Sequence, residues 1–326
     1  MVRKLVSRIA VVVGLLLVGL GVASVVRIPY YVEGPGSAPD VFPFIRVSGH
    51  EVYPPAGKFL LVSVSFTPAE AIDWLTTWVN PDTKLIPNGA FLAQGESPQQ
   101  EARRAGADLR ASEYAAEYVA LSKATAYPAR SGPGALIIAV EPGCPAQGKL
   151  HDGDVILSVD GSAIHGVEAL GKVIDAARPS RSLSFRVRLS DGSAAEIQVA
   201  KARCGPDQKE LVGISTIDSF PFQVDIRGEI GGPSGGLLFA LGLYDLLTPG
   251  DLTGGRVIAG TGQIDVEGNV YPIGGIEEKI VAAERAGADA FLVPQQNMAE
   301  ARRAGADIRL IPVKTFQDAL DRLQGS

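Results

Sequence analysis

The chain has few of the residues from which metal centres and disulfide scaffolds are built. Its 326 residues include only two cysteines and three histidines. Two cysteines are too few for a disulfide framework, and their spacing is not that of metal ligands. The histidines, His50, His151 and His165, are scattered and show no HExxH pattern. The sequence therefore predicts no zinc enzyme, no metal site and no cofactor.

A basic surface and a nucleotide-binding loop are also missing. Lys and Arg number 30 against 36 Asp and Glu, which gives a net charge of −6, and no Lys/Arg cluster is interleaved with aromatic residues. This balance argues against a nucleic-acid partner. The pattern GxxxxGK[ST] does not occur in the sequence, so we expect no ATP binding.

The N-terminus is the clearest compositional feature. Basic residues up to Arg8 precede residues 9–26, an apolar run of 18 residues without a charge. A helix of that length spans a bilayer, with its basic flank on the inside. We expect residues 1–30 to form an uncleaved, single-pass anchor in the cell membrane, with the bulk of the chain extracytoplasmic. A cleaved signal peptide is the alternative, because residues 22–24 loosely resemble a cleavage site.

Residues 31–117 form a juxtamembrane region that carries no recognisable chemistry. Its first part is rich in Pro and Gly and indicates extended chain and short strands. The segment "FLLVSVSF" predicts a strand, and "TPAEAIDWLTTWV" predicts a helix that the pair Thr67 and Pro68 would open. Residues 95–127 are expected to be largely helical.

Residues 118–203 are β-rich and resemble a known binding module. The segment "EPGCPAQGKLHDGDVILSVDGSAI" is similar to the core of a bacterial PDZ domain. In that family an extended peptide adds to a sheet edge while a Gly-containing loop captures its end. The resemblance implies that Gly134, Ala135 and Leu136 bind a peptide. A β-rich spacer without a ligand is the alternative.

The two cysteines, Cys144 and Cys204, bracket this PDZ-like segment. A disulfide persists in an extracytoplasmic compartment, so one hypothesis is that they pair. The other hypothesis is that both are buried free thiols.

Residues 204–326 alternate strands and helices, which predicts an α/β domain. The segment "VIAGTGQIDVEGNVYPIGG" predicts a strand pair that turns at Gly268 and Asn269. A helix over 276–287 should follow, then the strands "DAFLVP" and "IRLIPV" and a closing helix "TFQDALDRL". Including the PDZ-like domain and the N-terminal transmembrane helix, the expected fold class is α+β multidomain.

One serine, Ser234, lies in the glycine-rich stretch "EIGGPSGGLLFALG", just before an apolar helix. A phosphate loop would need a lysine after these glycines, and none follows. A trypsin-like site is a second explanation, because "GPSGG" resembles GDSGG, but no histidine has a matching context and the following chain is helical. A third explanation requires a base other than histidine.

Lys279, 45 residues after Ser234, can supply that base. Helical spacing puts Lys279 on one stripe with Ile276, Ile280 and Ala283, and it puts Glu277, Glu278, Glu284 and Arg285 on another. A lysine on the buried stripe is disfavoured in its charged form, and the lowered pKa lets it act as a base near neutral pH. A structural lysine whose amine reaches solvent is the alternative.

Three segments together resemble the proteolytic domain of Lon proteases and occur in the same order as in that family. They are "GGPSGGLLFALGLYDLLTPGDLTGG", "AGTGQIDVEGNVYPIGGIEEKI" and "AAERAGADAFLVP". The resemblance implies that Ser234 is the nucleophile, that Lys279 is the general base and that Thr261 orients it. The usual motif is PSAG, and this chain has Gly235 at its third position.

The residues around Ser234 have implied roles as well. Backbone N–H groups at the start of the following helix are expected to stabilise an oxyanion. Gly232 and Gly235 would leave room for a substrate backbone, and Pro233 would stiffen the turn.

These expectations combine into an ATP-independent, membrane-anchored serine endopeptidase with a Ser234–Lys279 dyad. Its PDZ domain would recognise protein or peptide substrates, and the resemblance to Lon proteases implies a homo-oligomeric ring. The alternative from another functional class is a catalytically silent PDZ adaptor at the membrane surface.

Overall fold

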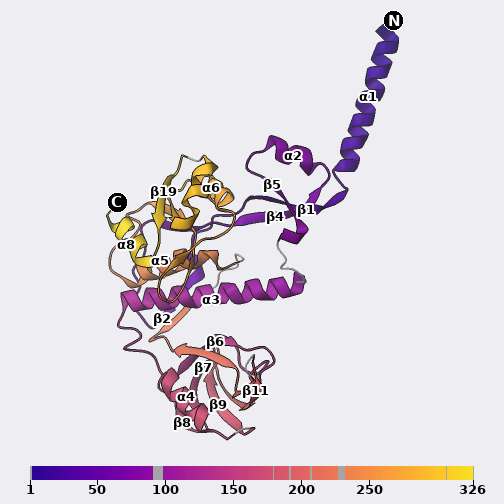
Figure 1. Cartoon of the computed structure of the whole chain (residues 1–326). Helices are drawn as coiled ribbons and strands as arrows, with labels where there is room; N and C mark the ends of the chain where they lie inside the picture. The colour runs from indigo at the N-terminus through magenta and orange to yellow at the C-terminus, as the bar shows by residue number, and fades with distance from the viewer. Residues whose placement is uncertain are drawn as a thin grey trace.

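The computed structural model of the chain describes residues 2–90, 98–178, 180–190, 192–205, 208–226, 232–305 and 307–325. An N-terminal helix projects from the body, one lobe contains the C-terminus, and a second lobe lies on the other side of the long helix α3 (Figure 1). The architecture is mixed α/β, as the sequence predicts.

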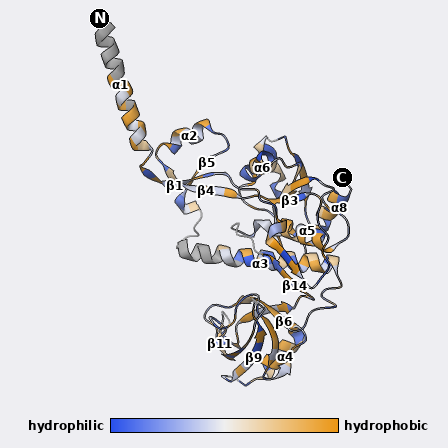
Figure 2. Cartoon of the chain, turned by 180° about the vertical axis from the view of Figure 1, so that it is seen from behind, coloured by the Kyte–Doolittle hydropathy of each residue, from blue (hydrophilic) through white to orange (hydrophobic). Residues whose placement is uncertain are grey.

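Helix α1 (Val2–Ala23) is the projecting element, and its coloured part is largely hydrophobic (Figure 2). Most of the large apolar side chains described there, from Val11 to Val22, are exposed. Within the described residues, no helix has the length and apolarity that a membrane crossing requires. The transmembrane helix predicted within residues 1–30 is therefore not confirmed and stays a prediction.

A three-stranded antiparallel sheet follows, in the order β4 (Val64–Glu70), β1 (Arg27–Pro35) and β5 (Lys84–Pro87). The helix predicted from Thr67 is wrong, because Thr67 and Pro68 lie in β4 and pair with β1. Pro68 is tolerated there since β4 is an edge strand. The helix α2 (Asp73–Val79) begins only where that pairing has ended.

A parallel four-stranded sheet organises the lobe that contains the C-terminus. Its order is β19 (Arg309–Val313), β18 (Ala290–Pro294), β15 (Val257–Gly260) and β3 (Lys58–Leu61). Side chains alternate between its faces. One face packs with α5 (Gly236–Leu247), α8 (Phe316–Gln324) and α3 (Pro98–Ala124), and the other with α6 (Ile276–Arg285) and α7 (Met298–Ala301). The strands and closing helix predicted over 257–326 are confirmed, and so is the hairpin of β16 (Gln263–Ile264) and β17 (Val270–Tyr271).

The juxtamembrane region is not separate from this lobe. Strand β3 is an edge of the parallel sheet, and β2 (Ile45–Ser48) pairs with β14 (Gln223–Ile226). Helix α3 runs through the predicted boundary at 117/118 and packs against α5. The division into 31–117 and 118–203 therefore does not follow the fold, because the core of the C-terminal domain is completed by strands and a helix that precede the PDZ-like segment.

The second lobe has its own sheet and core. The sheet order is β10 (Ala194–Ala200), β9 (Ser182–Arg188), β7 (Val155–Val159), β6 (Ala135–Val140) and β13 (Ile214–Asp218), with β8 (Ser162–Ala163) beside β7. Helix α4 (Val167–Ala176) packs in this lobe. The lobe extends past the predicted limit at residue 203, because β13 is one of its strands.

The cysteines of this lobe are bonded to each other. Cys204 ends β11 (Ala202–Cys204), which pairs with β12 (Lys209–Leu211) in a hairpin. Cys144 and Cys204 form a disulfide with their Cα atoms 5.3 Å apart. The pairing hypothesis is confirmed, and the free-thiol alternative is wrong.

Candidate active site

Ser234 lies in a single 3₁₀ turn, Pro233–Gly235, that leads directly into α5. Helix α5 is apolar and buried along most of its length, so it fixes the turn against the parallel sheet. Ser234 itself is half-buried. The hydroxyl of Ser112, on α3, donates a hydrogen bond to the Pro233 carbonyl at 2.7 Å. The nucleophile predicted from sequence is thus held on a rigid turn and remains accessible.

Lys279 lies in the first turn of α6, on the opposite face of the sheet from α5. The predicted buried stripe is confirmed, because Ile276, Lys279, Ile280 and Ala283 are all buried and Lys279 is only 5% exposed. One residue of the second stripe is buried as well. Glu278 is buried rather than solvated, and Lys84 of β5 pairs with its carboxylate at 2.7 Å.

The two helices bring Lys279 to Ser234 at the carboxyl edge of the parallel sheet, where Thr261 follows β15. Lys279 Nζ lies 2.9 Å from Ser234 Oγ and 3.2 Å from Thr261 Oγ1. Thr261 is fully buried, and its hydroxyl donates to the Ser234 carbonyl oxygen at 3.0 Å. Because the threonine proton is used there, its oxygen lone pairs face the lysine. A neutral amine can therefore donate to Thr261 and turn its own lone pair towards the serine hydroxyl.

Burial lowers the pKa of Lys279 to about 8. The cause is desolvation, since the ammonium has lost its water. Among the described residues, no carboxylate forms an ion pair with this lysine that would restore its charge. A lysine with this pKa has a substantial neutral fraction near pH 7–8, as a general base requires.

The glycines beside the serine have different roles. Gly232 has a φ of +101°, which favours glycine, and no atom of the described residues lies within 4 Å of where its Cβ would be. Gly235 is buried, and a Cβ there would lie 2.7 Å from Cδ1 of Leu61. The expectation that Gly235 leaves room for a substrate is therefore wrong: it leaves room for the core.

The backbone donors near Ser234 are partly engaged. The N–H of Gly236 donates to the Pro233 carbonyl, and that of Leu237 donates to the Gly262 carbonyl at 3.0 Å. The N–H of Gly262 in turn donates to the Ser234 carbonyl at 2.7 Å. These bonds fix the turn, and they leave the oxyanion role predicted for N–H groups at the helix start as a prediction.

The structure also places the three residues predicted to bind a peptide. Gly134 has a φ of +94°, and a Cβ there would lie 2.4 Å from the Ile156 carbonyl, so only glycine fits. Ala135 and Leu136 begin β6 with buried side chains. Their strand edge is paired with β13, as Asp218 lies opposite Ala135 and Ile217 opposite Leu136.

Comparison with known families agrees with this geometry. Residues 229–323 match the family model of the Lon protease (S16) C-terminal proteolytic domain. The chain carries a Lon-type proteolytic domain. Residues 106–200 match the family model of the PDZ domain. Both resemblances inferred from the sequence are thereby confirmed.

Individual relatives match the Lon-type domain over part of their length. Lon protease 1 of Herpetosiphon aurantiacus is 45% identical over 73 residues, which are 21% of this chain and 8% of that protein. Lon protease 2 of Bacillus subtilis is 38% identical over 127 residues, 36% of this chain and 22% of that protein. The chain thus spans less than a quarter of the length of these relatives. The PDZ domain of the SdrC-like protein Lin2157 from Listeria innocua is 19% identical, with a TM-score of 0.24, and the match covers 26% of this chain and 92% of that domain.

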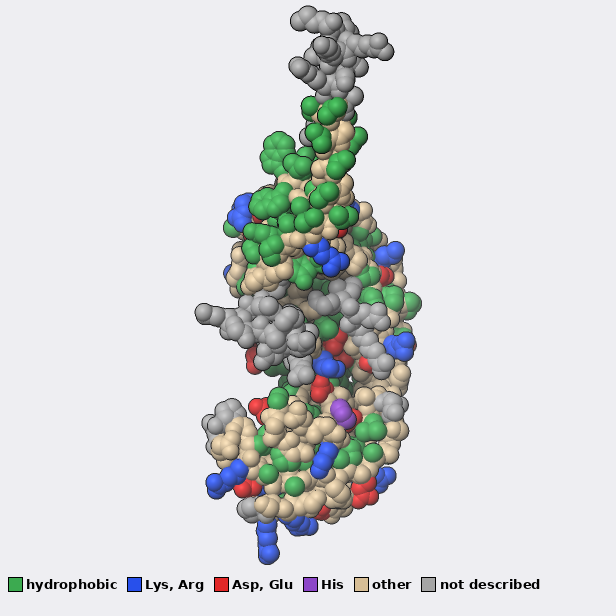
Figure 3. All heavy atoms as spheres, turned by 90° about the vertical axis from the view of Figure 1, so that its right-hand side faces the viewer, with side chains coloured by type: hydrophobic (Ala, Val, Ile, Leu, Met, Phe, Trp, Pro, Cys, Tyr) green, Lys and Arg blue, Asp and Glu red, His purple; other side chains and the backbone are tan. Residues whose placement is uncertain are grey.

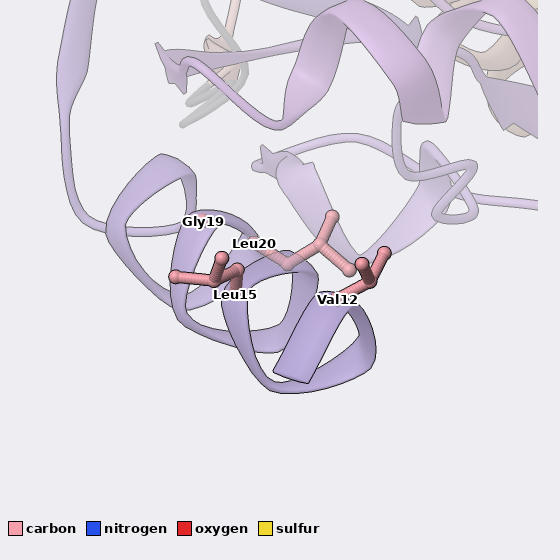
Figure 4. A pocket seen from close by; sticks show the side chains of 4 residues that line it. All are labelled: Val12, Leu15, Gly19 and Leu20. Carbon is pink, nitrogen blue, oxygen red and sulfur yellow. The ribbon is translucent and has the colours of Figure 1, made fainter. Parts of the chain in front are cut away.

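Away from the Lon-type domain, a shallow hollow lies along α1. Val12, Leu15, Gly19 and Leu20 line it (Figure 4). Its described lining is apolar.

Sequence reasoning missed the role of Ser112. A serine inside a long helix gives no signal that its hydroxyl will bond to the carbonyl of Pro233, which lies far along the chain.

Proposed function

We propose that this protein is an ATP-independent serine endopeptidase that uses a Ser234–Lys279 dyad. The observation that carries the proposal is the 2.9 Å contact between Lys279 Nζ and Ser234 Oγ, made by a buried lysine whose pKa is lowered to about 8. The family match and the Lon protease relatives support a serine peptidase.

The reaction follows from the positions of three side chains. Neutral Lys279 takes the proton of the Ser234 hydroxyl while Thr261 keeps the amine oriented. The serine oxygen attacks the peptide carbonyl, and backbone N–H groups of the turn stabilise the oxyanion. The lysine ammonium then gives its proton to the leaving amine, and the neutral amine activates the water that hydrolyses the acyl-enzyme.

We further propose that the protein works outside the cytoplasm, at the membrane, and that its PDZ domain recognises protein substrates. The Cys144–Cys204 disulfide supports an oxidising compartment. The exposed apolar side chains of α1 support a membrane attachment, and they continue into the neighbouring α2 (Figure 3). The sequence contains no P-loop, which supports independence from ATP. A homo-oligomeric ring remains part of the proposal by resemblance to Lon proteases.

A serine-directed fluorophosphonate probe on the purified full chain distinguishes this function from the adaptor alternative. We expect covalent labelling at Ser234 that disappears in Ser234→Ala and in Lys279→Arg. A folded wild-type chain that the probe does not label, and that cleaves no peptide, would identify the Lon-type domain as a silent scaffold.

A further inference from the structure

The edge of the PDZ sheet where a peptide would bind already holds a strand of the same chain. Strand β13 runs antiparallel to β6, with Asp218 opposite Ala135 and Ile214 opposite Val140. It also packs against α4. An extended peptide that pairs with this edge of β6 would occupy the position of β13, because it would need the same backbone N–H and C=O groups that β13 now uses.

The loop that precedes β6 holds the main chain of this segment as it passes. The N–H of Gly132 donates to the Ser219 carbonyl at 2.8 Å, and the hydroxyl of Ser219 donates to the Pro133 carbonyl at 3.0 Å. A Cβ on Gly132 would lie 2.2 Å from the Phe220 carbonyl. Because the chain continues through the loop, the geometry fits an internal segment rather than a free C-terminus.

An acidic side chain fixes the segment at the helix. Oδ1 of Asp218 accepts a hydrogen bond from the N–H of Val167, the first residue of α4, at 2.8 Å. A Cβ on the preceding Gly166 would lie 2.6 Å from that same oxygen. A carboxylate is favoured at a helix N-terminus by the orientation of the backbone N–H groups. The Tyr127 hydroxyl donates to the Asp218 carbonyl at 2.7 Å.

Burial and pairing stabilise β13 only weakly, although hydrogen bonds fix the chain at both of its ends. None of its five residues is buried, and Ser215 is exposed, whereas Ala135 and Ile137 of β6 are fully buried. The pairing is also irregular between Ser215 and Thr216. Ile214 and Ile217 pack against the neighbouring cores but are only partly buried. A strand with partly buried side chains and an irregular ladder opens more readily than the core around it.

The chain on either side of β13 is tied to the rest of the molecule. Before β13, the Gly213 carbonyl accepts from the N–H of Glu141, and a Cβ on Gly213 would lie 2.0 Å from Cβ of the disulfide-bonded Cys144. After β13, Phe220 is buried in the core that the Lon-type domain shares. Five extended residues have no slack between two fixed ends. Exchange therefore also releases the residues between Asp218 and β14, while the Gly213 end stays in place.

We propose that β13 is a built-in occupant of the PDZ peptide site and that substrates enter by strand exchange. The substrate class is an internal, extended protein segment that carries an acidic residue at the position of Asp218. The role of this exchange in capturing substrates rests on the proposed function. The exchange itself does not, because a binding assay measures it without any cleavage. The dyad is assembled with β13 in place, so short peptides need no exchange to be cleaved.

The first experiment measures binding on the full-length Ser234→Ala protein, so that cleavage plays no part. The probe is a fluorescent peptide with the sequence of residues 214–220, ISTIDSF, followed by anisotropy. We expect Asp218→Ala to bind it about tenfold more tightly, since the competing internal strand loses a charge-assisted hydrogen bond. The matched control is Asp175→Ala, an exposed position on α4, which should not change the affinity. A peptide with its aspartate replaced by alanine should bind more weakly.

The second experiment locks the strand in place. Ala139 and Ser215 lie opposite each other, and both are exposed, so a disulfide in Ala139→Cys/Ser215→Cys would join β6 to β13. We expect the oxidised double variant to lose peptide binding while each single variant keeps it. Binding to the locked chain at the wild-type level, or an unchanged affinity in Asp218→Ala, would overturn the proposal.

The third experiment separates the exchange from the peptidase. With Ser234 intact, the locked chain should still cleave a short chromogenic peptide, and its cleavage of unfolded casein should fall about tenfold because capture is lost. Equal casein cleavage by locked and wild-type chains would count against strand exchange. If the wild-type chain cleaves neither substrate, the proposed function fails, and the binding data still decide the exchange.

Discussion

Thr261 donates its hydroxyl proton to the carbonyl of Ser234 and at the same time lies 3.2 Å from the amine of Lys279. One buried hydroxyl therefore contacts both the turn that carries Ser234 and the amine of Lys279. Thr261→Val keeps the shape and removes this bond. We expect kcat for peptide cleavage to fall about tenfold to a hundredfold, as the amine is no longer oriented. Thr261→Ser, which keeps the hydroxyl, is the control and should retain most activity. Full activity in a folded Thr261→Val would contradict the orienting role.

The proposed dyad predicts that a residue at position 279 must be able to accept a proton, and that a permanent positive charge there is not sufficient for activity. Lys279→Arg keeps a positive charge and stays protonated at any workable pH, so it cannot accept the serine proton. We expect peptide cleavage to be lost as completely as in Ser234→Ala, and the double variant to lose little more, because the pair acts as a unit. Initial rates with one chromogenic peptide measure all three. Near-full turnover by a folded Lys279→Arg would rule out the lysine as the base.

The lowered pKa predicts a rising pH profile. With the pKa of Lys279 at about 8, the neutral fraction increases with pH, so kcat/KM should rise about tenfold per pH unit below 8 and level off above it. Rates between pH 5.5 and 9.5, with circular dichroism to confirm folding, measure this. A flat profile across that range would show that another group limits the reaction.

The same pKa makes a prediction about stability. Lys279 binds its proton less tightly in the folded state than in the unfolded state, where its pKa is near 10.5. Between about pH 8 and 10.5 the unfolded state therefore holds more protons, and the free energy of unfolding rises with pH by about 3 kcal/mol from this group. Lys279→Met lacks this contribution. Urea titrations of both chains should show the wild type gaining relative to Lys279→Met over that window, and parallel curves would contradict the shift.

Ser112 is expected to position the catalytic turn from outside the Lon-type domain. Ser112→Ala leaves the Pro233 carbonyl without its side-chain donor, so the turn loosens, and we expect kcat to fall about tenfold. KM and the apparent pKa of the profile should not change, because the dyad keeps its groups. Ser122→Ala on the same helix is the matched control, since that hydroxyl donates to the Tyr118 carbonyl one turn before it and not to the catalytic turn in the described structure. An equal effect of both substitutions would indicate a general loss of helix stability instead.

Both tryptophans of the chain lie on α2, where Trp74 is 57% and Trp78 is 85% exposed. Tryptophan is enriched at membrane interfaces, so the proposed membrane attachment predicts that α2 lies at the lipid headgroups. In the full chain reconstituted into phosphatidylcholine vesicles, shallow brominated lipids should quench the tryptophan fluorescence, and Trp78→Phe should lose the larger part of the quenched signal. Fluorescence that soluble iodide quenches and brominated lipid does not would place α2 in water.

The sequence by itself indicated a serine peptidase of the Lon type and most of the elements around the Ser234–Lys279 pair. Local patterns were sufficient for the strands over 257–313, because alternating burial and turn residues act over a few positions. Helical spacing alone predicted that Lys279 is buried, and the motif around Ser234 indicated the nucleophile. Thr67 and Pro68 show the limit of such signals, since pairing with β1 outweighs a local helix start.

Only the tertiary structure decided which distant segments complete each domain. Strand β3 joins a sheet whose other strands lie roughly 200 residues or more along the chain. Strand β13 pairs with residues of β6 that lie 74 to 83 positions before it. The hydrogen bond from Ser112 to the Pro233 carbonyl and the ion pair between Lys84 and the buried Glu278 also join segments that are far apart in the sequence. Backbone hydrogen bonds and close packing depend on where chain segments meet in space, and a local pattern of hydrophobic and turn residues does not encode that meeting point.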